Sequence, residues 1–77
     1  MHARHVKERI AADPNIMLGK PTIKGTRITV EIILRKMSEG MTVEGLLEAY
    51  PSLSREDVLA ALSYSADVIS EEAIIAS

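Results

Sequence analysis

The apolar residues of this chain repeat with two different periods, and the change falls near Thr29. Before that residue, the apolar positions 16 and 18, and again 28 and 30, lie two residues apart, which is the spacing of a strand with one covered face. Gly- and Pro-containing turns interrupt the same stretch, and Pro21 cannot donate to a β-ladder. The pattern predicts a β-arm over residues 13–29 that lies on the helices or pairs with the arm of a second chain.

After Thr29 the spacing becomes helical. A first helix is predicted between Thr29, whose hydroxyl suits an N-cap, and Gly40, which suits the position just past a helix end. Thr42 is placed to cap a second, short helix, and Pro51 stops it.

A third helix is predicted to begin at Ser54, because Ser54 and Asp57 have the spacing of a capping box. Its apolar stripe is expected to contain Val58, Leu62, Ser65 or Ala66, and Ile69, widened by Leu59, Ala61 and Tyr64.

These elements predict a mainly α fold, in which an N-terminal β-arm or hairpin is followed by a three-helix helix-turn-helix bundle. We expect one domain over residues 1–77, with a flexible N-terminus (1–12), the β-arm (13–29), the bundle (30–70) and a tail (71–77). The second and third helices resemble a helix-turn-helix, but an αα-corner has the same pattern, so both interpretations stay open.

The chain is small, and we expect it to need association. It has 77 residues and no cysteine, and a core of this size supplies no more than about 3–5 kcal/mol. No disulfide or thiolate metal site can add to that. With 47% hydrophobic residues, the chain is expected to form a homodimer or a complex with another protein.

The charges are unevenly distributed. Residues 1–40 carry eight Lys and Arg against four Asp and Glu, whereas residues 41–77 carry one against seven. A basic half suits a polyanion such as DNA, but the two halves could equally neutralise each other within or between subunits. The candidate nucleic-acid contacts are Lys20, Lys24, Arg27, Arg35, Lys36 and Arg55. The acidic third helix, with Arg55 as its single cation, argues against its use as a recognition helix.

No residue set predicts an enzyme or a cofactor site. Gly19-Lys20 lacks the rest of a phosphate-binding loop, since Pro14 and Pro21 occupy the positions of its first glycine and its Ser or Thr. His2 and His5 have no supporting ligands for a metal. The longest aliphatic run has five residues, from 58 to 62, so we expect no membrane span and a cytoplasmic protein.

The end of the third helix is more apolar than an exposed tail needs to be. We therefore expect it to contact a partner or a second subunit. The candidate partner contacts are Leu59, Ile69, Ile74 and Ile75.

Five segments together resemble a family of short bacterial proteins that is catalogued as a domain of unknown function and likened to VapB-type antitoxins. The residues that carry the likeness are Asp13-Pro14-Asn15-Ile16, Gly-Lys-Pro-x-Ile-x-Gly-Thr-Arg-Ile-x-Val from Gly19 to Val30, Ser38-Glu39-Gly40-Met41-Thr42-Val43-Glu44, Tyr50-Pro51-x-Leu53 and Asp57-Val58-x-Ala60-Ala61-Leu62-x-Tyr64. The resemblance covers residues 10–67 and implies a winged or homeodomain-like helix-turn-helix fold and a PIN-like toxin ribonuclease as partner.

The resemblance and the charges together favour an antitoxin of a type II toxin–antitoxin pair. Such a protein would bind a PIN-like toxin through its aliphatic surface and, with its basic arm and helix-turn-helix, operator DNA. The alternatives are an interaction or dimerisation module that binds no DNA, and a stand-alone transcriptional regulator without a toxin.

Overall fold

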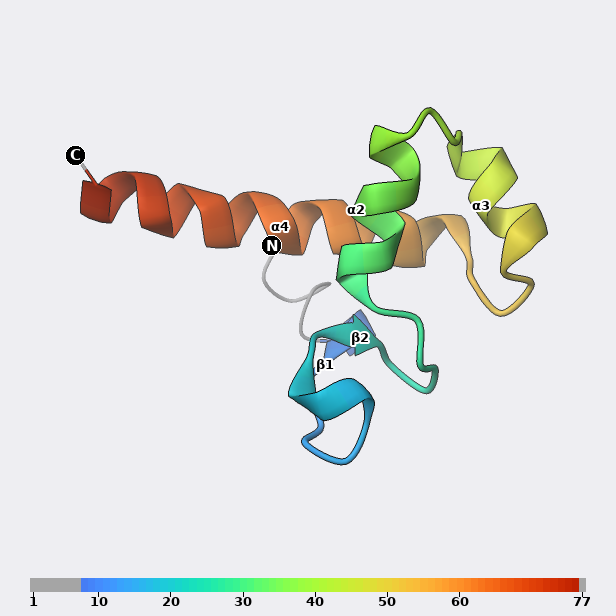
Figure 1. Ribbon diagram of the computed structural model, residues 1–77, viewed down its shortest axis with the longest axis horizontal. Coiled ribbons are helices and arrows are strands. Elements are labelled where there is room, and N and C mark those ends of the chain that lie inside the picture. Colours follow the sequence, from blue (N-terminus) through green and yellow to red (C-terminus); the bar gives the residue numbers. More distant parts are fainter. Residues whose placement is uncertain (1–7, 77) are drawn as a thin grey trace.

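The computed structural model describes residues 8–76, with side chains described as far as Ser70. Its elements follow in the order β1 (Ile10–Ala11), a 3₁₀ turn (Met17–Gly19), β2 (Thr22–Ile23), α2 (Val30–Ser38), α3 (Val43–Ala49) and α4 (Arg55–Ala76). Figure 1 shows α2 crossing α4, the strands below that crossing, and the C-terminal half of α4 extending past the other elements. The mainly α fold with an N-terminal antiparallel pair and three helices is confirmed.

The antiparallel pair is placed differently from the sequence prediction. Its first strand is β1, where Ile10 pairs with Ile23 and Ala11 with Thr22. These residues lie in the segment that was expected to be a flexible N-terminus, so that expectation is wrong for residues 10 and 11. A single bridge joins Thr22 to Thr29, which brings the chain back to the start of α2. β1 was missed because a two-residue strand leaves no periodic pattern in the sequence.

The predicted strand at positions 16 and 18 is also wrong, because this stretch forms consecutive turns. The Asn15 amide donates to the Asp13 carboxylate, and the Gly19 amide donates to the Ile16 carbonyl. Met17 and Leu18 adopt φ of 49° and 59°, the left-handed region that costs a non-glycine residue about 1–2 kcal/mol. The Leu18 side chain in this turn is 94% exposed.

Each end of α2 has the predicted local chemistry. The Thr29 hydroxyl accepts a hydrogen bond from the Ile32 amide, which satisfies one of the free donors of the first turn. At the other end, the Gly40 amide donates to the Met37 carbonyl and the Met41 amide to the Lys36 carbonyl. This is the Schellman arrangement, and it needs the positive φ of 103° at Gly40.

α3 and α4 also begin at the predicted caps. The Thr42 hydroxyl accepts from the Gly45 amide. The Ser54 hydroxyl accepts from the Asp57 amide, while the Asp57 carboxylate accepts from the Ser54 amide. This reciprocal pair is a capping box, and it sets the first residue of α4.

The core lies where α2, α3, α4 and β2 meet. Its members are aliphatic side chains and one alanine: Ile23, Val30, Ile33, Leu46, Leu53, Val58 and Ala61. Part of the stripe expected on α4 is wrong, because Leu62 and Ile69 are exposed while Ala60 and Ala61 are buried. The small alanines on the buried face of α4 leave room for close packing, whereas Leu62 and Ile69 lie off that face.

Candidate functional site

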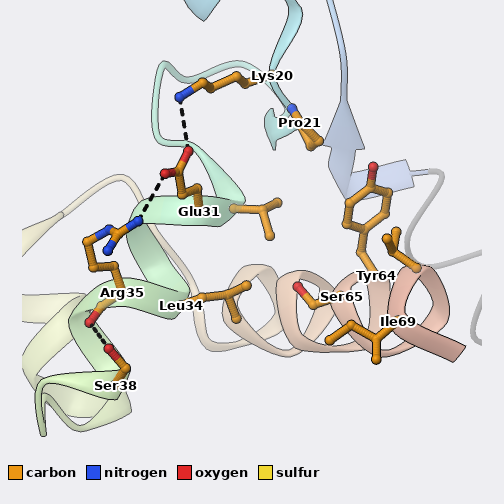
Figure 2. Close-up of a pocket in the computed structure, with 11 residues that line it drawn as sticks. Lys20, Pro21, Glu31, Leu34, Arg35, Ser38, Tyr64, Ser65 and Ile69 are labelled. Carbon is orange, nitrogen blue, oxygen red and sulfur yellow. Dashed lines mark hydrogen bonds and ion pairs between the residues drawn. The ribbon is translucent and has the colours of Figure 1, made fainter. Parts of the chain in front are cut away.

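An apolar groove of about 590 Å³ runs between α2 and α4. Figure 2 shows Leu34 of α2 and Tyr64, Ser65 and Ile69 of α4 on its walls, with Pro21 closing one end. Its lining is completed by Lys20, Val30, Glu31, Arg35, Ser38 and Val68. The groove opens to solvent, so it is a surface on which another molecule could lie.

The groove exists because α4 is longer than the elements that cover it. Val58 and Ala61 pack in the core, whereas Val68 and Ile69 remain 40% and 62% exposed. The helix of 22 residues is about 33 Å long at 1.5 Å per residue, and α2 of 9 residues crosses it once. The apolar surface past this crossing has no cover among the described residues.

Ion pairs border the α2 side of the groove. The Glu31 carboxylate lies 3.0 Å from the Lys20 ammonium and 3.2 Å from the Arg35 guanidinium. Hydrogen bonds from Lys20 and then from Arg35 lower the pKa of the Glu31 carboxyl. Two cations share one carboxylate, so this border keeps a net positive charge (Figure 2).

A second hollow of about 400 Å³ opens on the other side of this cluster. It contains Lys20, Arg27 and Arg35 beside the single carboxylate of Glu31. Its remaining lining is mixed: Met17, Ile28, Thr29, Ile32 and Tyr50. Three of the six predicted nucleic-acid contacts are therefore brought together, and the excess of cations suits a phosphate.

The predicted contact Arg55 lies elsewhere and is neutralised. Its guanidinium is 2.6 Å from the Glu44 carboxylate, so the first turns of α3 and α4 are joined by an ion pair. A hydrogen bond from its own backbone amide, and then Arg55, lower the pKa of Glu44. The start of α4 thus presents a paired cation beside Glu56 and Asp57.

Lys24 and Lys36 complete the predicted nucleic-acid set. Lys24 is exposed beside the left-handed Gly25, and Lys36 is half-buried on α2. Over residues 8–70, no ion pair within 4 Å involves Lys24, Lys36 or Arg27. Neither lysine lines the hollow that holds Arg27.

The predicted partner contacts of α4 differ in their surroundings. Leu59 is 53% exposed on its outer side, and Ile69 lines the groove. The side chains of Ile74 and Ile75 lie outside the described part of the chain. Sequence reasoning missed Leu34 and Val68 as groove residues, although Val68 follows the buried Val58 and Ala61 at helical spacing, which could have identified it.

Over residues 8–76, no cluster of three or more His, Cys, Asp and Glu side chains is placed to hold a metal ion. His2 and His5, which were weighed as metal ligands, lie outside the described residues. None of the described helices is both long enough and apolar enough to cross a membrane.

Comparison with known proteins identifies relatives over most of the chain. Residues 10–65 match the family described as Protein of unknown function (DUF433). The chain is 36% identical over 59 residues to "Uncharacterized protein y4eO" of Sinorhizobium fredii (strain NBRC 101917 / NGR234), a match that covers 77% of this chain and 27% of that protein. The chain thus spans about a quarter of the length of this curated relative.

The fold also matches a solved structure. A DUF433 member from Anabaena variabilis ATCC 29413, whose crystal structure was determined at 2.00 Å, superposes with a TM-score of 0.78 at 27% identity. The match covers 99% of this chain and 76% of the other. The arrangement of strands and helices described above therefore recurs in a second protein.

Proposed function

This chain belongs to the DUF433 family, and from that premise we propose that it is an antitoxin-like protein whose α4 docks on a PIN-like ribonuclease and blocks it. The apolar outer side of α4 is the observation that supports this most. Leu59 and Leu62 are exposed and share this side with Ala66, because residues three and seven apart lie on one helix face. An apolar stripe left in solvent is typical of a protein contact.

The charges around the stripe also suit such a partner. Glu56 and Asp67 are exposed on α4, and Arg55 is paired with Glu44, so this surface is acidic. A ribonuclease that binds RNA needs a basic surface for the phosphates. An acidic helix with an apolar stripe is complementary to that surface in both charge and hydropathy.

The test starts from the gene beside this chain, which we expect to encode a PIN-like protein, and consists of co-purification with that protein followed by an assay of its RNA cleavage. We expect the wild-type chain to bind and inhibit it, and Leu59→Asp or Leu62→Asp to weaken binding by about thirtyfold, as a lost interface anchor does. Leu18→Asp is the matched control, because Leu18 is exposed, lies on the Met17–Gly19 turn and is not part of α4. If Leu18→Asp weakened binding as much as Leu59→Asp, the docking surface would not be α4.

DNA binding is a second candidate function, which the cluster of Lys20, Arg27 and Arg35 favours. In this DNA-binding mode, the β-arm and the start of α2 bind the phosphates. α4, whose Arg55 is already paired with Glu44, does not enter the major groove of the duplex. This differs from a helix-turn-helix contact made by a recognition helix.

A salt titration on the upstream DNA decides between this function and the interaction-only alternative. If the arm binds phosphates, log K falls linearly with log salt, and Arg27→Ala reduces the slope by about 1. Arg55→Ala is the matched control and leaves the slope unchanged. No binding at low salt would leave a module that contacts proteins alone, and the lack of a neighbouring PIN-like protein would leave a stand-alone regulator.

A further inference from the structure

We infer that the groove between α2 and α4 seats the end of α4, residues 70–76, of a second copy of this chain. The two copies would exchange these ends around a two-fold axis, so that each groove is filled by the other copy. This interface centres on Val68, which is nine residues and therefore half a turn around α4 from Leu59, so it goes beyond the proposed function and does not depend on it.

The first argument is that the chain itself contains an apolar segment suited to the groove, but this segment cannot reach the groove of its own copy. Residues 70–76 carry Ile74 and Ile75, which are apolar enough to fill a groove. However, α4 is one continuous helix from Arg55 to Ala76. Its last turns lead away from the groove wall that Tyr64 and Val68 form, as the course of α4 in Figure 1 shows. Only a second chain can bring this segment to the groove.

The second argument is charge. The border of the groove has Lys20 and Arg35 on one carboxylate, Glu31, and is therefore net positive. The segment that would enter it carries Glu71 and Glu72 and no cation between residues 70 and 77. The basic half of one copy then lies against the acidic half of the other. The uneven charge distribution of the chain is thereby neutralised between the two subunits.

The third argument is symmetry. The groove wall and the occupant are neighbouring parts of the same helix, since Ser65, Val68 and Ile69 line the groove and residues 70–76 follow directly. Two α4 helices that run antiparallel past each other near Ile69 place each end on the other copy's groove at the same time. An interface of this isologous kind closes at two subunits.

The fourth argument is the need for more buried surface. The described core consists of seven residues, and a chain of this length without cysteine gains only about 3–5 kcal/mol from such a core. α2 buries one face and exposes a polar one, whereas α4 carries apolar residues on both sides of the helix. Apolar side chains exposed outside the core-facing side of a helix are typical of a surface that another chain covers.

The test measures the mass of the full-length chain by sedimentation equilibrium over a dilution series. We expect a reversible dimer of the 8.4 kDa chain. Val68→Asp, on the groove wall, should raise the dimer Kd by about tenfold or more, and Leu59→Asp, the matched change on the outer side, should leave it unchanged. Wild type that stays monomeric throughout, or a dimer lost in Leu59→Asp and kept in Val68→Asp, would overturn the inference.

A charge exchange keeps the test decisive if Val68→Asp fails to fold. The double variant Lys20→Glu/Arg35→Glu changes two exposed residues and should weaken the dimer. Adding Glu71→Lys and Glu72→Lys to this variant should restore the dimer. Absence of both effects contradicts the inference. A chain that is monomeric alone, and loses its complex with the PIN-like protein in Val68→Asp but not in Leu59→Asp, would assign the groove to that partner instead.

Discussion

Arg9 and Asp57 lie 48 positions apart in the chain, and their side chains form an ion pair with 3.0 Å between Nη1 and Oδ1. Asp57 is the residue that completes the capping box of α4, so the same carboxylate accepts the Ser54 amide through its other oxygen. Arg9 directly precedes β1, and its carbonyl accepts from the Lys24 amide. This one pair therefore ties the strands to the first turn of the longest helix.

Removing the Asp57 carboxylate should destabilise the fold. Asp57→Ala loses a helix cap and a part-buried ion pair, and we expect the free energy of unfolding to fall by about 1–3 kcal/mol in urea titrations at one protein concentration. Arg9→Ala should cost less, because the cap remains. The neighbouring Glu56→Ala is exposed and is expected within about 0.5 kcal/mol of wild type; equal losses in Asp57→Ala and Glu56→Ala would contradict the role of this carboxylate.

Leu46 holds α3 to the core. Its side chain is fully buried, so Leu46→Ala should lower the free energy of unfolding by about 2–5 kcal/mol, through lost transfer energy and a cavity. In a chain of this size that change should broaden or abolish the cooperative thermal transition. Leu59→Ala is the matched control, and its transition should remain close to that of wild type because half of this side chain is in solvent.

The left-handed turn at Leu18 should be open to stabilisation. Asn tolerates this conformation because of its short polar side chain, so we expect Leu18→Asn to raise the free energy of unfolding by about 0.5–1 kcal/mol. Gly25 has φ of +82° with no atom near an added Cβ, so Gly25→Ala should lower it by about 1 kcal/mol through backbone strain alone. Thermal melts of the two variants should shift in opposite directions.

The Glu31 cluster should make stability depend on pH on the acid side. The pKa of Glu31 is lowered below its usual 4.5 by Lys20 and Arg35, so its ionised form favours the folded state. Wild type should exceed Glu31→Gln in stability above that pH, and the difference should disappear as pH falls through the lowered pKa. Since all three groups are exposed, the difference should be small and should shrink in about 1 M salt. A difference that persists at acid pH would contradict the ion-pair origin.

The helix boundaries could be predicted because they depend on contacts within a few residues. Thr29, Thr42 and Ser54 each accept the amide three positions ahead, as their positions before apolar helical segments indicated. Gly40 likewise ends α2 through bonds to the turn just before it. Such local interactions can be read from one stretch of sequence.

The candidate site was only partly predictable. The sequence marked Lys20, Arg27 and Arg35 as cations of interest, and the fold brings them to one hollow. It did not reveal that Arg55 is neutralised by Glu44, since that pair depends on the angle between α3 and α4. The groove itself has no sequence signal, because it forms where two helices separated by 16 residues of sequence cross and then diverge.

The β-arm shows the same division. Its glycines and prolines correctly indicated turns, and Gly19 and Gly25 do adopt the left-handed backbone. Yet the strand that pairs with β2 comes from Ile10 and Ala11, outside the predicted arm. A two-residue strand is defined by its partner rather than by its own pattern.

The sequence by itself thus determined the order and N-caps of the helices and the ends of α2 and α3, because each rests on interactions between near neighbours. The end of α4 was not determined, since the helix continues to Ala76 through the predicted tail. The tertiary structure alone decided where β1 pairs, which face of α4 is buried and which Lys and Arg side chains are neutralised by an ion pair. Those outcomes depend on contacts between residues such as Arg9 and Asp57, whose approach is set by the packing of the whole core and by no single stretch of the chain.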